Sequence, residues 1–212
     1  MGNCLYIVVP CYNEEEVLPE TSRRLEDKLR ALMVAGKVSA ESRVLFVDDG
    51  SKDRTWPIIR ELAAREGSLF AGVSLSRNRG HQNALMAGLM TALGRADAAV
   101  SIDADLQDDL EALDAMVDFW REGCDVVYGV RKSRRSDTFL KRATAEGYYH
   151  LLEKLGCEIV FNHADYRLLS ARALEALSRF GESALFLRGI VPMLGFKSAV
   201  VEYERLPRLA GE

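Results

Sequence analysis

Along the first 130 residues, short apolar runs alternate with longer segments of helical spacing, and this alternation constrains the fold more than any other feature. The runs are rich in Val and Ile, while the segments between them repeat apolar residues every three or four positions. Such alternation is typical of β-α units, which build a mostly parallel sheet flanked by helices. The expected strands are Leu5–Val9, Val44–Val47, Leu69–Leu75, Ala98–Ile102 and Val126–Val130, and the expected helices include residues 17–32, 84–93 and 113–120.

After Gly129 the alternation fades into a basic segment, a helix expected at about Phe139–Leu155, and a mixed tail of strands and a helix. No repeat, low-complexity tract or linker interrupts the chain, so one domain over residues 1–212 is more economical than two. We expect this α/β domain to consist of two halves, residues 1–130 and 131–212, that bind different ligands.

Charge and cysteine content narrow the class of function. A net charge of -4 and a pI near 5.6 argue against a general nucleic-acid binder, which normally carries a basic excess. Cys4, Cys11, Cys124 and Cys157 form no C-x-x-C pair, so neither a zinc cluster nor a disulfide framework is indicated, and a reducing, cytoplasmic setting fits best. No charged stretch followed by a long apolar run appears at the start of the sequence, and no run approaches the about 18 apolar residues that a membrane span needs, so we expect a soluble chain.

Polar residues follow each expected strand at the point where it ends. The segments are Pro10-Cys11-Tyr12-Asn13-Glu14, Asp48-Asp49-Gly50-Ser51, Arg77-Asn78-Arg79, Asp103-Ala104-Asp105 and Arg131. Because the carboxyl ends of parallel strands meet at one edge of a sheet, where open α/β sheets bind ligands, these residues should share one crevice. No G-x-G-x-x-G motif follows the first strand and no G-x-x-x-x-G-K-[ST] motif occurs, so phosphate groups must be held in another way.

The segment from Asp103 to Gln107 offers another way to hold phosphate. Two carboxylates one residue apart at a strand end can bind one divalent cation whose far side stays open to a diphosphate, and Gln107 could add an oxygen. Asp-x-Asp also arises by chance in turns, so the motif alone does not distinguish a metal site from a plain loop. The convergence of five strand ends favours the metal site.

Several segments together resemble the inverting family 2 glycosyltransferases. They are Val9–Glu15, Val47–Asp53, Ser76–Gln82 and Asp103–Asp108, and the later segments Val127–Arg131, Asp165–Leu169 and Phe186–Gly189 agree with them. Within that family the chain is most similar to the polyprenyl-phosphate glycosyltransferases, which include dolichol-phosphate mannose synthase and the bactoprenol glucosyltransferases. The resemblance covers nearly the whole chain.

The resemblance implies a GT-A type fold whose first half binds a nucleotide diphosphate sugar, such as UDP-glucose. By similarity, Pro10, Tyr12, Glu14, Asp48 and Asp49 would contact the base and ribose, while Asp103, Asp105 and Gln107 would hold Mg²⁺ or Mn²⁺ and the diphosphate. Further candidate donor contacts are Asn13, Ser51, Arg77 and Arg134. The chemistry agrees, because carboxylates accept hydrogen bonds from ribose hydroxyls and a tyrosine ring gives a base a stacking surface.

The resemblance also implies an acceptor, a polyprenyl phosphate at the cytoplasmic face of a membrane. An anionic phosphate needs groups that position it more than it needs a strong base. The densest basic cluster contains Arg131, Arg134, Arg135, Lys141 and Arg142, although a solvated loop near anionic lipid would look the same. Asp165 could orient the acceptor, approach the metal, act as a base or simply pair with Arg167. Arg188 could reach either phosphate or cap a helix, and His81, at a helix start, fits packing at least as well as ligand contact.

Two departures qualify the resemblance. Family members often carry two prolines where this chain has Asp109-Leu110, which alters the turn after the metal site but removes no ligand. The chain also ends at Leu206–Glu212, where many relatives lead into a juxtamembrane helix and membrane spans. We therefore expect a catalytic domain of a longer, membrane-anchored protein, with a naturally soluble relative as the alternative.

Other functions stay open at this point. A family 2 transferase that acts on a polysaccharide or another glycan hydroxyl would need a true base. A non-catalytic nucleotide-binding assembly subunit would keep the fold without turnover, and a nucleotidyltransferase would release pyrophosphate. The sequence does not identify the sugar, choose between Mg²⁺ and Mn²⁺, or decide between a monomer and a homo-oligomer.

Overall fold

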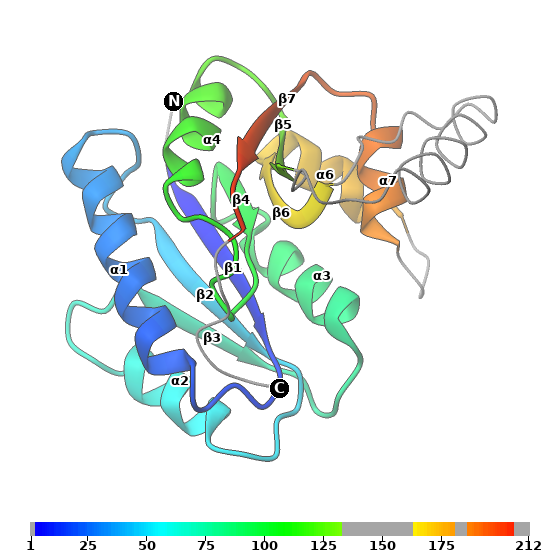
Figure 1. Cartoon of the computed structure of the whole chain (residues 1–212). Helices are drawn as coiled ribbons and strands as arrows, with labels where there is room; N and C mark the ends of the chain where they lie inside the picture. Colours follow the sequence, from blue (N-terminus) through cyan, green and yellow to red (C-terminus); the bar gives the residue numbers. More distant parts are fainter. Residues whose placement is uncertain (1–2, 133–162, 181–185, 206–212) are drawn as a thin grey trace.

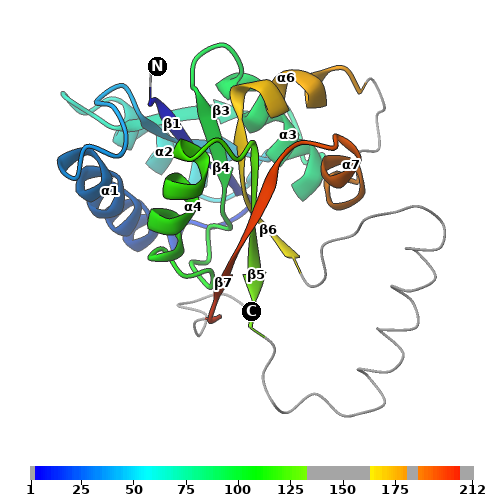
Figure 2. The same ribbon diagram turned by 90° about the horizontal axis from the view of Figure 1, so that it is seen from above.

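A computed structural model describes residues 3–132, 163–180 and 186–205, which form one seven-stranded sheet with helices on both faces (Figures 1 and 2). The elements are β1 (Leu5–Cys11), α1 (Leu18–Val34), β2 (Arg43–Asp48), α2 (Thr55–Ala63), β3 (Phe70–Ser74), α3 (His81–Ala92), β4 (Ala98–Ser101), α4 (Ala112–Arg121), β5 (Val126–Arg131), β6 (His163–Ser170), α6 (Ala171–Ser178), α7 (Leu187–Met193) and β7 (Ser198–Tyr203). The helix expected at 139–155 lies outside the described residues.

The sheet is mostly parallel, as the alternation predicted. Its strand order is β3-β2-β1-β4-β6-β5-β7. The first four strands pair in parallel, and β7 pairs in parallel with β5, whereas β6 lies between β4 and β5 and runs antiparallel to both. Strand β6, which follows residue 131 in the chain, therefore inserts between two strands of the first 131 residues. The two expected halves share this sheet.

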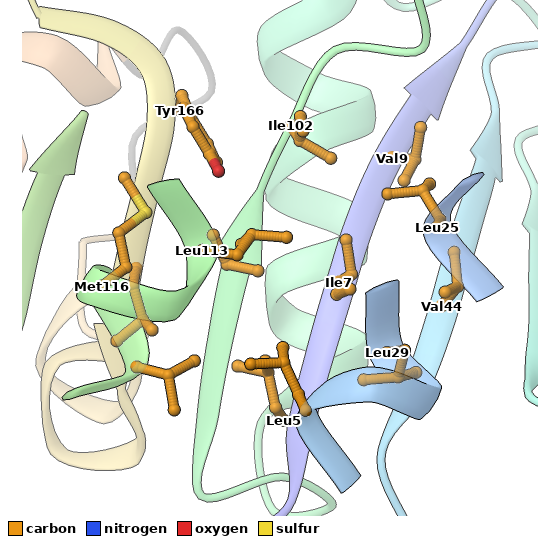
Figure 3. Close-up of a cluster of buried hydrophobic side chains, with 14 of the residues drawn as sticks. Leu5, Ile7, Val9, Leu25, Leu29, Val44, Ile102, Leu113, Met116 and Tyr166 are labelled. Atoms are coloured by element: carbon orange, nitrogen blue, oxygen red, sulfur yellow. The ribbon is translucent and has the colours of Figure 1, made fainter. Parts of the chain in front are cut away.

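Both faces of the sheet are buried, so successive strand residues belong to two separate cores. Ile7 and Val9 face the core under α1, α2 and α4, whereas Val8 faces the core under α3, α6 and α7. Figure 3 shows the first core, where Ile7 and Val44 of the sheet point toward Leu25 and Leu29 of α1. Burial on both sides explains why these strands read as continuous apolar runs in the sequence.

Strand β1 continues two residues beyond the expected end, so Pro10 lies inside the strand. Its Cα is paired with that of Val47 of β2, and its side chain is buried. Alternate strand residues face the same neighbour, and Val8 accepts a hydrogen bond from Ile102 on the β4 side. Pro10 faces that same side beyond the end of β4, so its missing N–H group leaves no sheet hydrogen bond unmade.

Because β6 runs antiparallel to β4 and β5, its first residues lie at the edge of the sheet where those two strands end. Ser101 at the end of β4 is paired with Arg167 of β6. Because the strands are antiparallel, Asp103 and Asp165, each two residues further toward this edge, come close together. An acidic residue near the start of β6 thus joins the residues that follow the ends of β1, β2, β4 and β5.

Candidate active site

The loops after β1 and β2 are joined to each other by hydrogen bonds, at the edge of the sheet where these strands end. The N–H group of Asn13 donates to Ser51 Oγ at 2.9 Å, and the N–H group of Lys52 donates to Asn13 Oδ1 at 2.9 Å. Asn13 has φ 55, a left-handed conformation that asparagine tolerates better than most residues. Glu14 joins the contact because its N–H group donates to Thr55 Oγ1 at 2.8 Å.

Tyr12, between β1 and these contacts, is 40% exposed, and an exposed tyrosine ring can stack on a planar group.

The two carboxylates that end β2 are each only 2% exposed and are bound to the chain's own donors. Asp48 accepts hydrogen bonds from the Ser51 N–H group at 3.1 Å and from Ser74 Oγ at 2.9 Å. Asp49 accepts two backbone N–H groups of the loop before α3, at 2.7 and 2.8 Å. In this arrangement both carboxylates hold the loops at the edge of the sheet where the parallel strands end.

Arg77 is exposed, and its backbone forms one of the closest loop contacts of this region. Gly50 has φ +70, and a Cβ atom there would lie 2.6 Å from the carbonyl carbon of Arg77. Only glycine therefore allows the loops after β2 and β3 to approach each other so closely.

The segment after β4 alternates between half-buried and buried residues. Asp103, Asp105 and Gln107 are half-buried, whereas Ala104, Leu106 and Asp108 are buried. A hydrogen bond from Thr21 Oγ1 of α1 to the Ala104 carbonyl, at 2.7 Å, holds the buried side of this segment. The three residues predicted to bind metal thus belong to the outer, accessible set.

The donor set of this segment fits a hard divalent cation. Asp103 and Asp105 supply carboxylate oxygens and Gln107 an amide oxygen, the ligand type that Mg²⁺ and Mn²⁺ prefer. Burial raises the pKa of Asp103; His81 works against that shift, and the carboxylates of Asp108 and Asp105 add to it. A cation bound here would relieve this repulsion.

The described residues alone do not complete a cage around such a cation. Among them, no three His, Cys, Asp or Glu side chains gather into a metal-binding group. Gln107 is also engaged elsewhere, because its N–H group donates to Asp105 Oδ1 at 3.1 Å and its side-chain oxygen accepts from Arg205. A bound diphosphate or water could supply further ligands.

Asp165 is the most heavily hydrogen-bonded carboxylate of the site. Its Oδ1 accepts from Arg167 at 2.8 Å, and its Oδ2 accepts from Gln82 Nε2 at 3.1 Å and from Arg188 at 3.2 Å. Burial alone would raise the pKa of Asp165, but hydrogen bonds from His81 and Arg188, with the charges of Arg167 and Arg188, hold it well below its ordinary value. The salt bridge between Asp165 and Arg167, a residue of β6, is therefore present, and Arg188 of α7 also contacts Asp165.

His81 occupies the space between the two acidic groups. Its Nε2 lies 3.6 Å from Asp103 Oδ1 and 3.6 Å from Asp165 Oδ2, and the side chain is 44% exposed. The hydrogen bond to Asp165 raises the pKa of His81, against the effect of burial, and the charges of Asp103 and Asp165 add to the rise. His81 therefore lies beside both acidic groups of the candidate site, at the start of α3.

Arg131 lies at the end of β5 and contacts the residue that follows Gln107. Its guanidinium donates to Asp108 Oδ1 at 3.0 Å and to the hydroxyl of Tyr203 at 3.1 Å. Arg134, with Arg135, Lys141 and Arg142, lies outside the described residues. The structure thus places Asp103 and Asp165 on either side of His81, with Arg188 on Asp165. Asp105 and Gln107 follow Asp103 on the same segment, and Arg131 contacts the Asp108 of that segment. The predicted base and ribose contacts lie at the ends of β1 and β2 and on the loops that follow them.

Sequence reasoning missed two contributors to this arrangement, Gln82 and Tyr203, and gave no definite site role to His81, which it placed at a helix start. Gln82 was passed over because the regular helix was expected over residues 84–93, whereas α3 begins at His81. The available signal was that Gln82 lies in the polar segment between the third expected strand and the expected helix. Tyr203 carried no comparable signal, because a single tyrosine in a late strand reads as core.

Comparison with known proteins agrees with the fold and with the motifs. The family model described as "Glycosyl transferase family 2" matches residues 6–178. The chain is 52% identical over 208 residues to "Uncharacterized glycosyltransferase YkoT" of Bacillus subtilis (strain 168), covering 98% of this chain and 61% of that protein. It is 39% identical over 209 residues to "Bactoprenol glucosyl transferase" of Shigella phage SfX, covering 97% of this chain and 65% of that protein. The chain therefore spans less than two thirds of the length of these relatives.

Solved structures of low sequence identity share the fold. A mannosyltransferase, PcManGT from Pyrobaculum calidifontis in complex with GDP-Man and Mn²⁺, matches with a TM-score of 0.62 at 19% identity, over 99% of this chain and 59% of that one. S. aureus TarS 1-349 in complex with UDP-GlcNAc matches with a TM-score of 0.61 at 16% identity, over 99% of this chain and 60% of that one. These likenesses agree with a GT-A-like α/β fold.

Proposed function

The chain belongs to glycosyl transferase family 2, and on that premise we propose that it transfers a hexose from a nucleotide diphosphate sugar to a polyprenyl phosphate, with inversion at the anomeric carbon. The donor half would be residues 1–130, and residues 131–212 would supply most acceptor contacts. UDP-glucose is the proposed donor.

The hydrogen bonding of Asp165 is the observation that carries the choice of acceptor. Both of its oxygens accept from arginine side chains, and Oδ2 also accepts from Gln82. A carboxylate so well supplied with donors is a weak proton acceptor, in keeping with its lowered pKa. A hydroxyl acceptor needs a base at this point, whereas a phosphate monoester is already anionic near neutral pH. This difference supports a phosphate acceptor over a glycan hydroxyl.

In the proposed reaction, a phosphate oxygen of the acceptor forms a bond to the anomeric carbon while the bond from that carbon to the donor diphosphate breaks. The bonding electrons leave with the nucleoside diphosphate, and no proton has to be taken from the nucleophile. Arg188 would contact phosphate, with Asp165 holding its guanidinium in place, and Arg131 and Arg134 would contact the acceptor.

On the donor side, Asp103, Asp105 and Gln107 would hold a divalent cation, Mg²⁺ or Mn²⁺, that neutralises charge on the departing diphosphate. Tyr12 would stack on the base, and the loops shaped by Asn13, Asp48, Asp49 and Ser51 would surround the ribose. Glu14 and Arg77 border the same side of the crevice and are further proposed contacts. The buried position of Pro10 limits it to shaping this loop.

The choice of a polyprenyl acceptor is supported by a relative of this chain. The Shigella phage SfX relative is a "Bactoprenol glucosyl transferase", and this name supports both a lipid acceptor and a glucosyl donor. None of the described helices is long and apolar enough to cross a membrane. A polyprenyl acceptor would nevertheless bring this chain to the cytoplasmic face of a membrane.

A product assay tests the proposal directly. The chain is incubated with a panel of nucleotide sugars, Mg²⁺ or Mn²⁺ and a short polyprenyl phosphate, and the lipid fraction is analysed by mass spectrometry. We expect a glycosyl phospholipid and release of a nucleoside diphosphate. Release of pyrophosphate, or transfer to a glycan hydroxyl at a higher rate than to the lipid phosphate, would overturn the proposal.

A further inference from the structure

The segment from Asp103 to Asp109 is here called the Asp103–Asp109 loop. It is attached to the last described strand, β7, through its buried residue Asp108. The hydroxyl of Tyr203 in β7 donates to Asp108 Oδ1 at 2.5 Å and accepts from Arg131 Nε at 3.1 Å. Arg131 also donates to the same oxygen of Asp108 at 3.0 Å. The three side chains thus form a closed triangle between β5, β7 and the loop.

Asp108 depends on these two donors. The residue is 1% exposed, and its Oδ2 is buried without a hydrogen-bond partner in the part of the chain that the structure describes. A buried carboxylate is stable only while donors compensate for its lost hydration. Removing the Tyr203 hydroxyl would leave Arg131 as the one described donor to this carboxylate.

The loop also needs an external attachment because its backbone is strained. Leu106 has φ 49, a left-handed conformation that a bulky residue rarely adopts. Such strain persists only where the surrounding structure holds the backbone firmly. Leu106 is anchored in the core, and the Tyr166 hydroxyl donates to the Asp109 carbonyl at 3.1 Å. The ring of Tyr166 in turn packs edge-on against Tyr203, with centroids 5.3 Å apart.

We infer that Tyr203 is a positioning residue for donor binding. Its hydroxyl holds Asp108, and through Asp108 it keeps the outward carboxylates of Asp103 and Asp105 in a conformation ready for a cation and a diphosphate. It also fixes Arg131, the proposed acceptor contact, to the same loop. The inference rests on the proposed function because the loop is assigned to the donor.

Hydrogen exchange of the ligand-free chain tests the attachment without relying on that function. Tyr203→Phe removes one hydroxyl and keeps the ring, and we expect backbone amides 104–109 to exchange about tenfold faster, with amides 49–51 unchanged. Tyr6→Phe, in β1, is the matched control and should change neither segment. Unchanged exchange at 104–109 in Tyr203→Phe would overturn the inference.

Calorimetric titration with UDP then tests positioning. We expect Tyr203→Phe to weaken UDP binding in the presence of Mn²⁺ about tenfold and to leave Mn²⁺-free binding unchanged. In a double-mutant cycle, Asp108→Asn should add little to the effect of Tyr203→Phe, because both break the same contact. Equal weakening with and without Mn²⁺ would mean a merely structural role and would overturn the inference. A wild-type chain that binds neither UDP nor GDP would count against the proposed function, while amide exchange would still decide the attachment.

Discussion

Two pairs of aspartates end neighbouring parts of the same sheet, and their surroundings differ. Asp48, the last residue of β2, and Asp49, which follows it, are buried and accept hydrogen bonds from nearby loop N–H groups and a serine. Asp103 and Asp105 follow β4 and are half-buried, in a segment whose alternate residues point into the core. The first pair holds the loops at this edge of the sheet, and the second leaves its charge partly accessible there.

The difference shows that an acidic pair at a strand end has two uses that sequence alone does not separate. Adjacent aspartates place their side chains on opposite sides of the backbone, so both can be bound by loops that cross there. Aspartates one residue apart point the same way and can share a ligand. Substitution of one member of each pair should therefore damage different properties.

The largest effect is expected for Asp105→Ala. Losing one of two carboxylates at the site of the leaving diphosphate should reduce transfer about a thousandfold, as for other charge-stabilising groups. Thermal unfolding should change little, because the side chain lies outside the core. Asp27→Ala, an exposed aspartate of α1, is the control and should leave the rate unchanged. A rate near that of the wild type would remove Asp105 from the site.

A large effect of another kind is expected for Asp49→Ala. The N–H group of Arg79 would lose its acceptor and that of Gly80 would keep only Asn78 Oδ1, so the free energy of unfolding should fall by about 2 kcal/mol. Urea denaturation measures this loss, and Asp105→Ala provides the comparison within the same fold. If Asp49→Ala proved as stable as Asp105→Ala, the distinction between the two pairs would fail.

The fold itself followed closely from the sequence, apart from one strand. Each of the five expected strands overlaps an observed one, because burial on both faces leaves an unbroken apolar run that is easy to recognise. The insertion of β6 between β4 and β5 was not predicted. Its pairing joins residues about 70 positions apart, such as Val100 and Leu168, and no local pattern specifies a partner at that distance.

The sequence allowed prediction of site residues that follow a strand end. It did not allow prediction of residues that act on the site only through another residue. Asp103, Asp105 and Asp165 were named from their positions, and the structure brings them to one edge. Their functional roles, with those of Arg131 and Arg134, remain predictions. The buried Arg167 was foreseen only as a salt-bridge partner, and Tyr203 was not foreseen at all, since nothing local marks a residue that acts through Asp108.

A smaller effect on rate is expected for Asp165→Asn. If Asp165 positions Arg188 rather than accepting a proton, transfer to a polyprenyl phosphate should fall about tenfold and not a thousandfold. Asp125→Asn, which alters another buried carboxylate bound to Ser170 and Arg172, should leave the rate unchanged. A thousandfold loss in Asp165→Asn would indicate a base and favour a hydroxyl acceptor.

The same substitution has a predicted pH dependence in stability. The pKa of Asp165 is lower in the folded chain than the ordinary value of about 4, so its charge stabilises the fold above that pH. The stabilisation is lost as the pH falls through the folded pKa, because the protonated carboxyl then resembles the amide. The gap in unfolding free energy between wild type and Asp165→Asn should therefore shrink below about pH 4. It should also shrink as the pH rises through the pKa of His81, because the contact between Asp165 and protonated His81 is lost there. A gap that widened below about pH 4 would contradict the assigned ion pairs.

The smallest effect is expected for Thr21→Val, which examines the inner side of the Asp103–Asp109 loop. Valine fills the same buried space but leaves the Ala104 carbonyl without the hydrogen bond from Thr21 Oγ1. The free energy of unfolding should fall by about 1 kcal/mol, and Mn²⁺-dependent UDP binding should weaken a few-fold. Thr21→Ser keeps the hydroxyl and should retain the binding, even where loss of the methyl group costs stability. If Thr21→Ser and Thr21→Val weakened UDP binding equally, packing of α1 rather than this hydrogen bond would hold the outward aspartates in place.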